Sequence, residues 1–165
     1  AFNRHVDSAS KKEVGELLIL AESYGAGEIF LNSVDNDGMK SGFDLELYNY
    51  AKEKTSIPII LCGGAGNPHH FLEASNIGAR SLCAGNFFHF TEQSVITTKQ
   101  YLKQNGVGVR LESQAKYDNA EYVEGSYRIK KQSELVLEKM KFEYFQDEKI
   151  WDIVKDALIL KTTLL

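Results

Sequence analysis

The chain has 165 residues, of which 43% are apolar and 25% charged, with a formal net charge of −4 and a pI near 5.6. This balance is ordinary for a globular domain, and the lack of a broad basic stripe argues against a nucleic-acid partner. No apolar stretch reaches the ~18 residues of a membrane span, and the N-terminus lacks a signal-peptide pattern. We therefore expect a cytoplasmic protein with no membrane partner.

Apolar positions at helical spacing predict a first helix from Lys11 to Tyr24, which Gly25 and Gly27 end. The next apolar run predicts a buried parallel strand from Glu28 to Asn32. A helix expected from Asp44 to Lys54 would cover that strand.

The second strand is expected from Ile57 to Leu61, and Pro68 opens a helix that ends at Gly78. A third strand follows from Arg80 to Ala84, and a further helix from Gln93 to Gln104. Strands separated by helices every ~25–30 residues predict a parallel sheet with right-handed crossovers. The expected fold class is therefore α/β.

Residues 111–165 differ in character from the rest. The segment from Lys116 to Tyr127 is polar and rich in tyrosine, which suits a loop or an edge hairpin. From Ile150 to Ile159, apolar residues form a helical stripe. We expect two domains, 1–110 with the βα repeats and 111–165 as a partly helical extension that packs on the first domain or on a partner.

Each predicted strand leads into a loop that contains glycine. The first loop is acidic and reads Asn32-Ser-Val-Asp-Asn-Asp-Gly38, and the others read Cys62-Gly-Gly-Ala-Gly66 and Ala84-Gly-Asn-Phe87. Glycine lets the backbone approach an anion without hindrance from a β-carbon, and the N–H groups of such turns form a nest for phosphate. The alternative is that these glycines only make tight turns between strand and helix.

Five motifs fall in one order and spacing that matches a known family: Gly25-Ala-Gly-Glu-Ile29, Ser33-Val-Asp-Asn-Asp-Gly38, Ser41-Gly-Phe-Asp44, Gly63-Gly-Ala-Gly66 and Phe88-His-Phe90. Together they resemble the cyclase subunit of imidazole glycerol phosphate synthase, a phosphate-binding (β/α)8 barrel. The resemblance runs from about Lys11 to Arg110. It implies the C-terminal half of a TIM barrel, with strands six to eight, because the chain is short for an eightfold barrel of ~250 residues.

The resemblance implies phosphate contacts at Gly38, Gly64, Gly85 and Asn86, and Gly63 is a further ligand-binding candidate because it belongs to the same glycine-rich turn. The resemblance also places Asp37 against the substrate, as the candidate catalytic residue, and Asn32 where the family has a threonine that contacts the substrate. The alternative for Asp37 is a structural Asx-type turn formed with Asp35.

Glu28 matches a glutamate at the opposite mouth of the family's barrel, where a charged gate admits ammonia from a glutaminase subunit. The alternative is a solvated charge at a strand end. The family's two acid–base aspartates lie on strands that would precede Ala1, so the resemblance leaves the activity of this chain alone open. The function it implies is the ammonia-dependent cyclase/lyase step of histidine biosynthesis, acting on a phosphorylated small molecule without a cofactor.

Two other functions stay open: a non-catalytic phosphate-binding fragment, or an ammonia-channelling paralog for nucleotide-sugar amidation in surface-polysaccharide synthesis. The form of the motif from Asn32 to Met39 resembles those paralogs. Because a half-barrel exposes two sheet edges and an open core, we also expect a homodimer or a higher homo-oligomer.

Two residue pairs could hold a metal or a redox centre. Cys62 and Cys83 end two predicted strands, and we interpret them as reduced, buried side chains, with a redox pair as the alternative. His69 and His70 are adjacent at a helix start, point about a third of a turn apart and chelate poorly. We expect these histidines on the surface and no metal site.

Overall fold

The computed structural model describes residues 2–3, 8–9, 13–89, 95–112, 117–131 and 133. The chain divides into two compact units, residues 1–130 and 131–165. Everything below concerns the first unit. The helical stripe expected from Ile150 to Ile159 lies outside the described residues.

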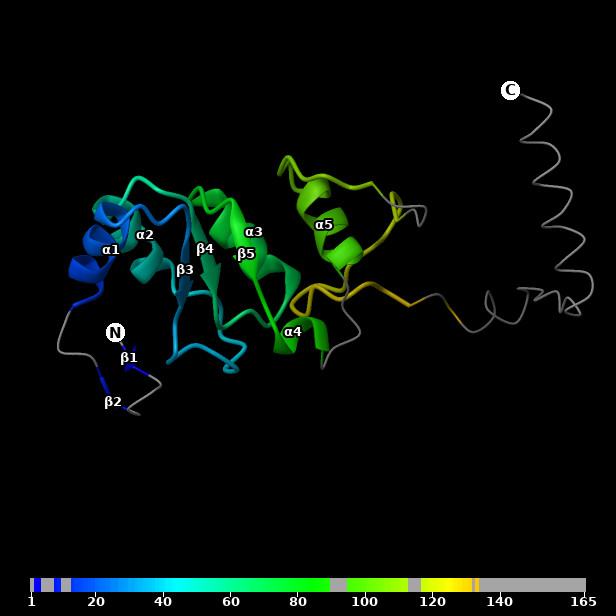
Figure 1. Cartoon of the computed structure of the whole chain (residues 1–165). Helices are drawn as coiled ribbons and strands as arrows, with labels where there is room; N and C mark the ends of the chain where they lie inside the picture. The colour runs from blue at the N-terminus through cyan, green and yellow to red at the C-terminus, as the bar shows by residue number, and fades with distance from the viewer. Residues whose placement is uncertain are drawn as a thin grey trace, which may run out of the picture. The chain divides into compact units, whose positions relative to one another are not determined.

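A parallel sheet of three strands forms the centre of the first unit (Figure 1). Its order is β3 (Ile29–Asn32), β4 (Ile59–Cys62) and β5 (Ser81–Cys83), with β4 in the middle. A separate antiparallel pair joins β1 (Phe2–Asn3) to β2 (Ser8–Ala9). The predicted parallel α/β arrangement is confirmed, as an open sheet.

Helices connect the strands in the expected order. They are α1 (Val14–Ser23), α2 (Leu45–Lys54), α3 (Pro68–Asn76), the short α4 (Asn86–His89) and α5 (Val95–Gln104). The cap of α2 is Asp44, whose carboxylate accepts from the N–H of Leu47 at 2.9 Å, and α3 is capped in the same way by Asn67. Helix α4 was not predicted. No helix in the described part of the chain is long and apolar enough to cross a bilayer.

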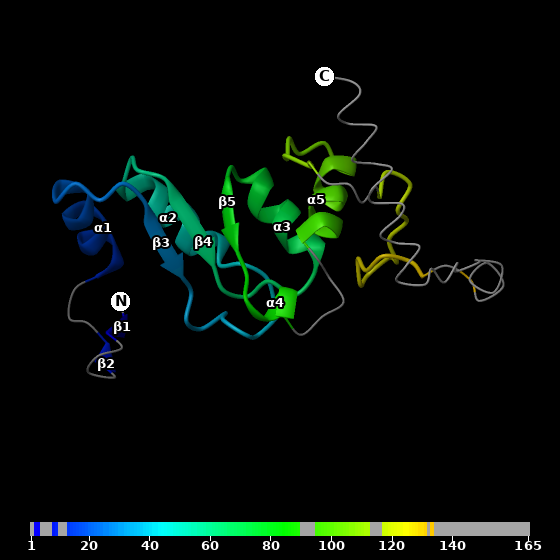
Figure 2. The same ribbon diagram turned by 45° about the vertical axis from the view of Figure 1, so that its right-hand side comes forward.

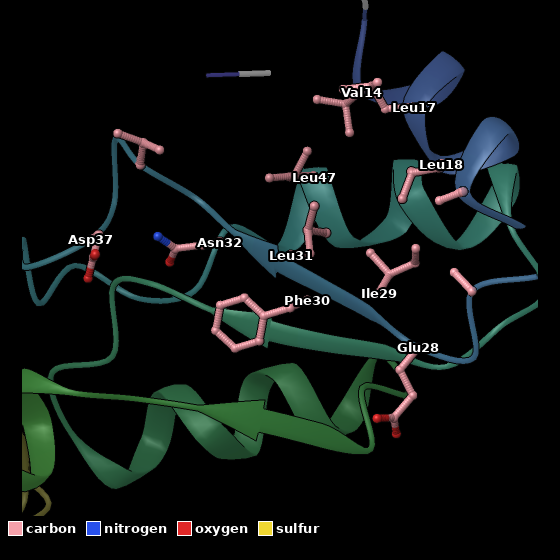
Figure 3. A pocket seen from close by; sticks show the side chains of 13 residues that line it. Val14, Leu17, Leu18, Glu28, Ile29, Phe30, Leu31, Asn32, Asp37 and Leu47 are labelled. Carbon is pink, nitrogen blue, oxygen red and sulfur yellow. The ribbon is translucent and has the colours of Figure 1, made fainter. Parts of the chain in front are cut away.

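One face of the sheet carries helices and, among the described elements, the other face does not (Figure 2). Leu31 of β3 and Leu61 of β4 are buried and pair in register on the side that carries the helices. Phe30, which points the other way, is 59% exposed (Figure 3). The expectation that the strand from Glu28 to Asn32 is buried was therefore wrong for one face, because nothing in the described chain packs over it.

The polar segment after α5 forms a small hairpin. Tyr122 bridges Ile129 in antiparallel fashion, and the N–H of Lys130 donates to Glu121 O at 2.8 Å. The hydroxyl of Tyr122 donates to Thr97 O of α5 at 2.8 Å. Of the two expected alternatives, a loop or an edge hairpin, a hairpin is seen, but within the described residues it packs on helix α5 and not on the edge of the sheet.

Removing side-chain volume should cost much more on the covered face than on the open one. Leu61 is completely buried in the central strand, so Leu61→Ala should lower the free energy of unfolding by about 2–5 kcal/mol. Phe30→Ala should lower it by less than about 1 kcal/mol, since most of that side chain already faces water. Urea unfolding of both variants checks this. Equal losses would show that the open face is covered in solution.

Candidate functional site

Three loops meet at the carboxyl edge of the sheet, one after each strand. They form a crevice lined by Asp37, Gly38, Gly63, Gly64, Ala65, Ala84, Gly85, Asn86 and Phe87. Six of these nine residues belong to the predicted site: Asp37, Gly38, Gly63, Gly64, Gly85 and Asn86. Carboxyl ends of parallel strands are the usual position of ligand sites in α/β proteins.

The first two loops interlock through their backbones. The N–H of Gly42 donates to Gly64 O at 2.9 Å, and the side-chain amide of Asn36 donates to Gly42 O at 3.3 Å. Gly64 has φ +96°, and a β-carbon there would collide with the carbonyl oxygen of Gly42. Gly66 is equally crowded, against Lys40 O. These glycines are therefore required by the packing of the loops, whatever ligand the crevice holds.

The crevice offers backbone donors. Within the described residues, the N–H groups of Gly38, Gly64, Gly85 and Asn86 donate to no protein acceptor. The first and third loops also approach each other, because a β-carbon on Gly38 would lie 3.5 Å from the side-chain nitrogen of Asn86. N–H groups without a protein acceptor, gathered from three loops around one crevice, suit an oxyanion.

The acidic loop is held at its two ends by contacts that the sequence did not indicate. The hydroxyl of Ser33, itself buried, donates to the carboxylate of Asp44 at 3.0 Å. The N–H of Asp37 donates to Ser33 O at 3.0 Å. Because Asp44 also caps α2, one carboxylate ties the loop to the helix that follows it.

The Asx-type turn proposed for Asp35 and Asp37 is not seen. In the described structure neither carboxylate accepts a hydrogen bond from the loop, and the side chain that ties the loop is Asn36. Asp37 lines the crevice, whereas Asp35 does not. Of the two carboxylates, only Asp37 is therefore placed to meet a ligand in the crevice.

His70 supports the second loop. Its Nδ1 accepts the N–H of Gly66 at 3.0 Å, and its Nε2 lies 3.1 Å from the side-chain amide of Asn67. The expected surface position was therefore wrong: His70 is half-buried, because its ring extends from helix α3 against the loops at Gly42 and Gly66. Burial lowers the pKa of His70. Glu73 partly offsets this effect, and His69 adds slightly to it.

His69 is also half-buried. Its ring stacks on that of Tyr127 at 4.6 Å between centroids, and its Nδ1 lies 3.1 Å from the hydroxyl of Tyr101. The histidine thereby helps to hold the hairpin on α3. Among the described residues, no three histidine, cysteine or acidic side chains cluster as metal ligands would.

The lowered pKa of His70 gives a pH dependence. Only neutral imidazole can accept from Gly66, so its contribution to stability is complete above pH 6.5, the ordinary value, and is lost as pH falls through the lower folded pKa. We expect the His70 ring proton to titrate below 6.5 by NMR. Between pH 7.5 and 5.5, the urea midpoint of His70→Gln should change less than that of the wild type, because the titrating group is gone. A titration at or above 6.5 would contradict this role.

A larger groove of about 840 Å³ runs along β3 beside the crevice (Figure 3). Asp37 lines both, and Asn32 and Glu28 lie farther along the groove. Glu28 precedes β3, so it lies at the opposite end of that strand from Asp37. Six predicted site residues share the crevice. Asn32 lies next to it, since a β-carbon on Gly63 would lie 2.9 Å from Asn32 Oδ1, and only Glu28 lies at the far end of β3.

The fold and the crevice define a class: a βα-repeat protein with glycine loops suited to an anion at the carboxyl edge of its parallel sheet. Residues 3–94 match the family model described as histidine biosynthesis protein, and the chain belongs to that family.

The curated relatives include three imidazole glycerol phosphate synthase subunits HisF. That of Thermotoga sp. (strain RQ2) is 48% identical over 108 residues, which are 63% of this chain and 43% of the relative. That of Campylobacter concisus (strain 13826) is 48% identical over 102 residues, or 62% and 40%. That of Pyrococcus furiosus is 46% identical over 91 residues, or 55% and 36%. The chain thus spans less than half the length of these relatives.

Proposed function

We propose that the crevice binds the phosphate group of a phosphorylated small molecule. The observation that carries this is the convergence of three consecutive βα loops whose N–H groups at Gly38, Gly64 and Gly85 lack a protein acceptor in the described structure. Backbone N–H groups bind phosphate oxygens without adding a charged side chain. The site also lies after the last two strands of the sheet, where phosphate sites recur in βα barrels.

Asp37 has a different role in this proposal. Its carboxylate lines the same crevice, and a carboxylate repels a bound phosphate. We therefore assign it to the uncharged part of the ligand, where it can accept a hydrogen bond from a hydroxyl or exchange a proton. Asn32, farther along the groove, would contact the same part of the ligand.

In this proposal the chain contributes strands six to eight to a cyclase-type barrel, and the segment from residue 111 is an extension. The open face around Phe30 supports this, because it would face the interior once further strands closed the sheet. The reaction is then the ammonia-dependent cyclase/lyase step, with the acid–base aspartates supplied by the part of the barrel that this sequence does not cover. Glu28, exposed at the amino end of β3, would face an ammonia-delivering glutaminase subunit.

A non-catalytic phosphate-binding module is a second candidate. It is favoured by one observation: the three loops whose N–H groups lack a protein acceptor all belong to the described part of this chain. The two candidates agree on phosphate and differ in turnover. Adding a separately expressed N-terminal half should restore ammonia-dependent turnover if the first is right and leave it absent if the second is right.

Calorimetric titration tests the shared claim. Glycerol phosphate should bind saturably with a one-to-one ratio, and glycerol should not, because the phosphate group supplies the interaction. Equal heats for the two ligands would overturn the proposed site. Competition by inorganic phosphate would show that the anion itself is recognised.

A further inference from the structure

Cys62 and Cys83 end the two neighbouring strands β4 and β5. They are paired directly in the register, as are Leu61 and Leu82 one residue earlier. Neighbouring strands lie about 4.8 Å apart, and paired residues point to the same face. Because Leu61 is buried on the helix side, both cysteines point to the open face, in one row with Asn32.

The two side chains are direct neighbours across the strand pair. Both cysteines are free thiols and are half-buried. Burial, the charge of Cys83 and a hydrogen bond with the Cys83 side chain raise the pKa of Cys62 to about 11. Adjacent paired strands also bring the two Cα atoms within the range of about 4.4–6.8 Å that a disulfide spans. The structure thus holds the reduced form of a pair that can be joined.

We propose that Cys62 and Cys83 form a thiol–disulfide exchange site, which low-molecular-weight disulfides of the glutathione type oxidise to an intramolecular disulfide. One cysteine thiolate attacks the small disulfide and releases one small thiolate. The other cysteine thiolate then attacks the protein sulfur of the mixed disulfide and releases the second small thiolate. The protein loses two protons and two electrons, and the small disulfide takes up the two electrons.

The position of this pair gives the modification a consequence. Gly63 and Gly64 follow Cys62 directly, and Gly85 lies two residues after Cys83. A bond between the cysteines would therefore join the strand ends from which two loops of the crevice emerge. The exchange chemistry does not depend on phosphate binding, and its test needs no ligand.

The test uses the fact that the chain has only two cysteines. The protein is equilibrated with mixtures of oxidised and reduced glutathione, quenched with acid, tagged with a maleimide and weighed intact. We expect a monomeric species two hydrogens lighter that takes no tag. Cys62→Ser and Cys83→Ser should each carry at most one glutathione adduct. The rate should rise with pH above 7, because each attacking cysteine must first lose its proton.

Repeating the equilibrium in urea tests whether the folded sheet is what brings the two thiols together. If the sheet holds the thiols together, disulfide formation in the folded protein should be favoured at least tenfold over that in the unfolded chain. A wild-type protein with two glutathione adducts, disulfide-linked dimers, full tagging under the most oxidising mixture, or equal constants in water and urea would each overturn the proposal.

Discussion

Gly64→Ala is expected to destabilise the protein more than any other change of one methyl group in the crevice. The new β-carbon would collide with the carbonyl oxygen of Gly42, and φ +96° is a strained conformation for alanine. Backbone strain and overpacking each cost about 1–3 kcal/mol, so the free energy of unfolding should fall by roughly 2–6 kcal/mol. Chemical denaturation monitored by circular dichroism measures this loss.

Gly27→Ala is the matched control. A β-carbon on Gly27 would meet no atom within 4 Å, and its φ lies outside the left-handed region. It should therefore change stability by less than about 1 kcal/mol. If Gly64→Ala proves as mild as this control, the two loops do not interlock as described, and the crevice has another shape.

Gly85→Asp should weaken phosphate binding without unfolding the protein. A β-carbon on Gly85 meets nothing within 4 Å, yet the residue lines the crevice, so the added carboxylate has room beside the bound anion. Unit charges 4 Å apart repel by about 1–4 kcal/mol between bulk water and a protein surface. Because about 1.4 kcal/mol is a factor of ten, affinity for glycerol phosphate should fall by roughly five- to 700-fold.

Gly27→Asp controls for charge alone, because it adds the same carboxylate outside the residues that line the crevice. It should leave phosphate affinity within about twofold, and both variants should unfold at the wild-type urea midpoint. Equal weakening by both aspartates would mean that net charge governs binding, and the assignment to this crevice would then fail.

The periodicity of the sequence predicted the order of strands and helices because local signals mark them. Pro68 stands at the start of α3 and Gly78 just beyond its end, as expected. Boundaries shifted by one to three residues, since the ends of elements depend on contacts made elsewhere. Helix α4 was missed because one turn from Asn86 to His89 leaves no periodic pattern.

The sequence periodicity could not predict which face of the sheet is covered and which is exposed. The run Ile29-Phe-Leu31 is apolar throughout, which indicates burial on both sides. In the structure only Leu31 is buried, and Phe30 is open. An apolar run shows that a face suits burial, but it does not show whether the described chain supplies the cover.

The crevice was predictable as a set of glycine loops, but its internal supports were not. Asn36 holds the carbonyl of Gly42 in its own loop, and His70 of α3 holds the N–H of Gly66 in the second loop. His69 and Tyr127 stack although they are far apart in the sequence. Such contacts depend on three-dimensional proximity, and no local pattern marks them.

Amide NMR of protein labelled with ¹⁵N-glycine tests the central claim most directly. On titration with glycerol phosphate, the signals of Gly38, Gly64 and Gly85 should shift along one saturable curve, since their N–H groups face the bound oxygens. Gly27 and Gly108 should not move, because they lie outside the crevice. Shifts spread evenly over all glycines, or none at the three crevice positions, would contradict the assignment of a phosphate site to these loops.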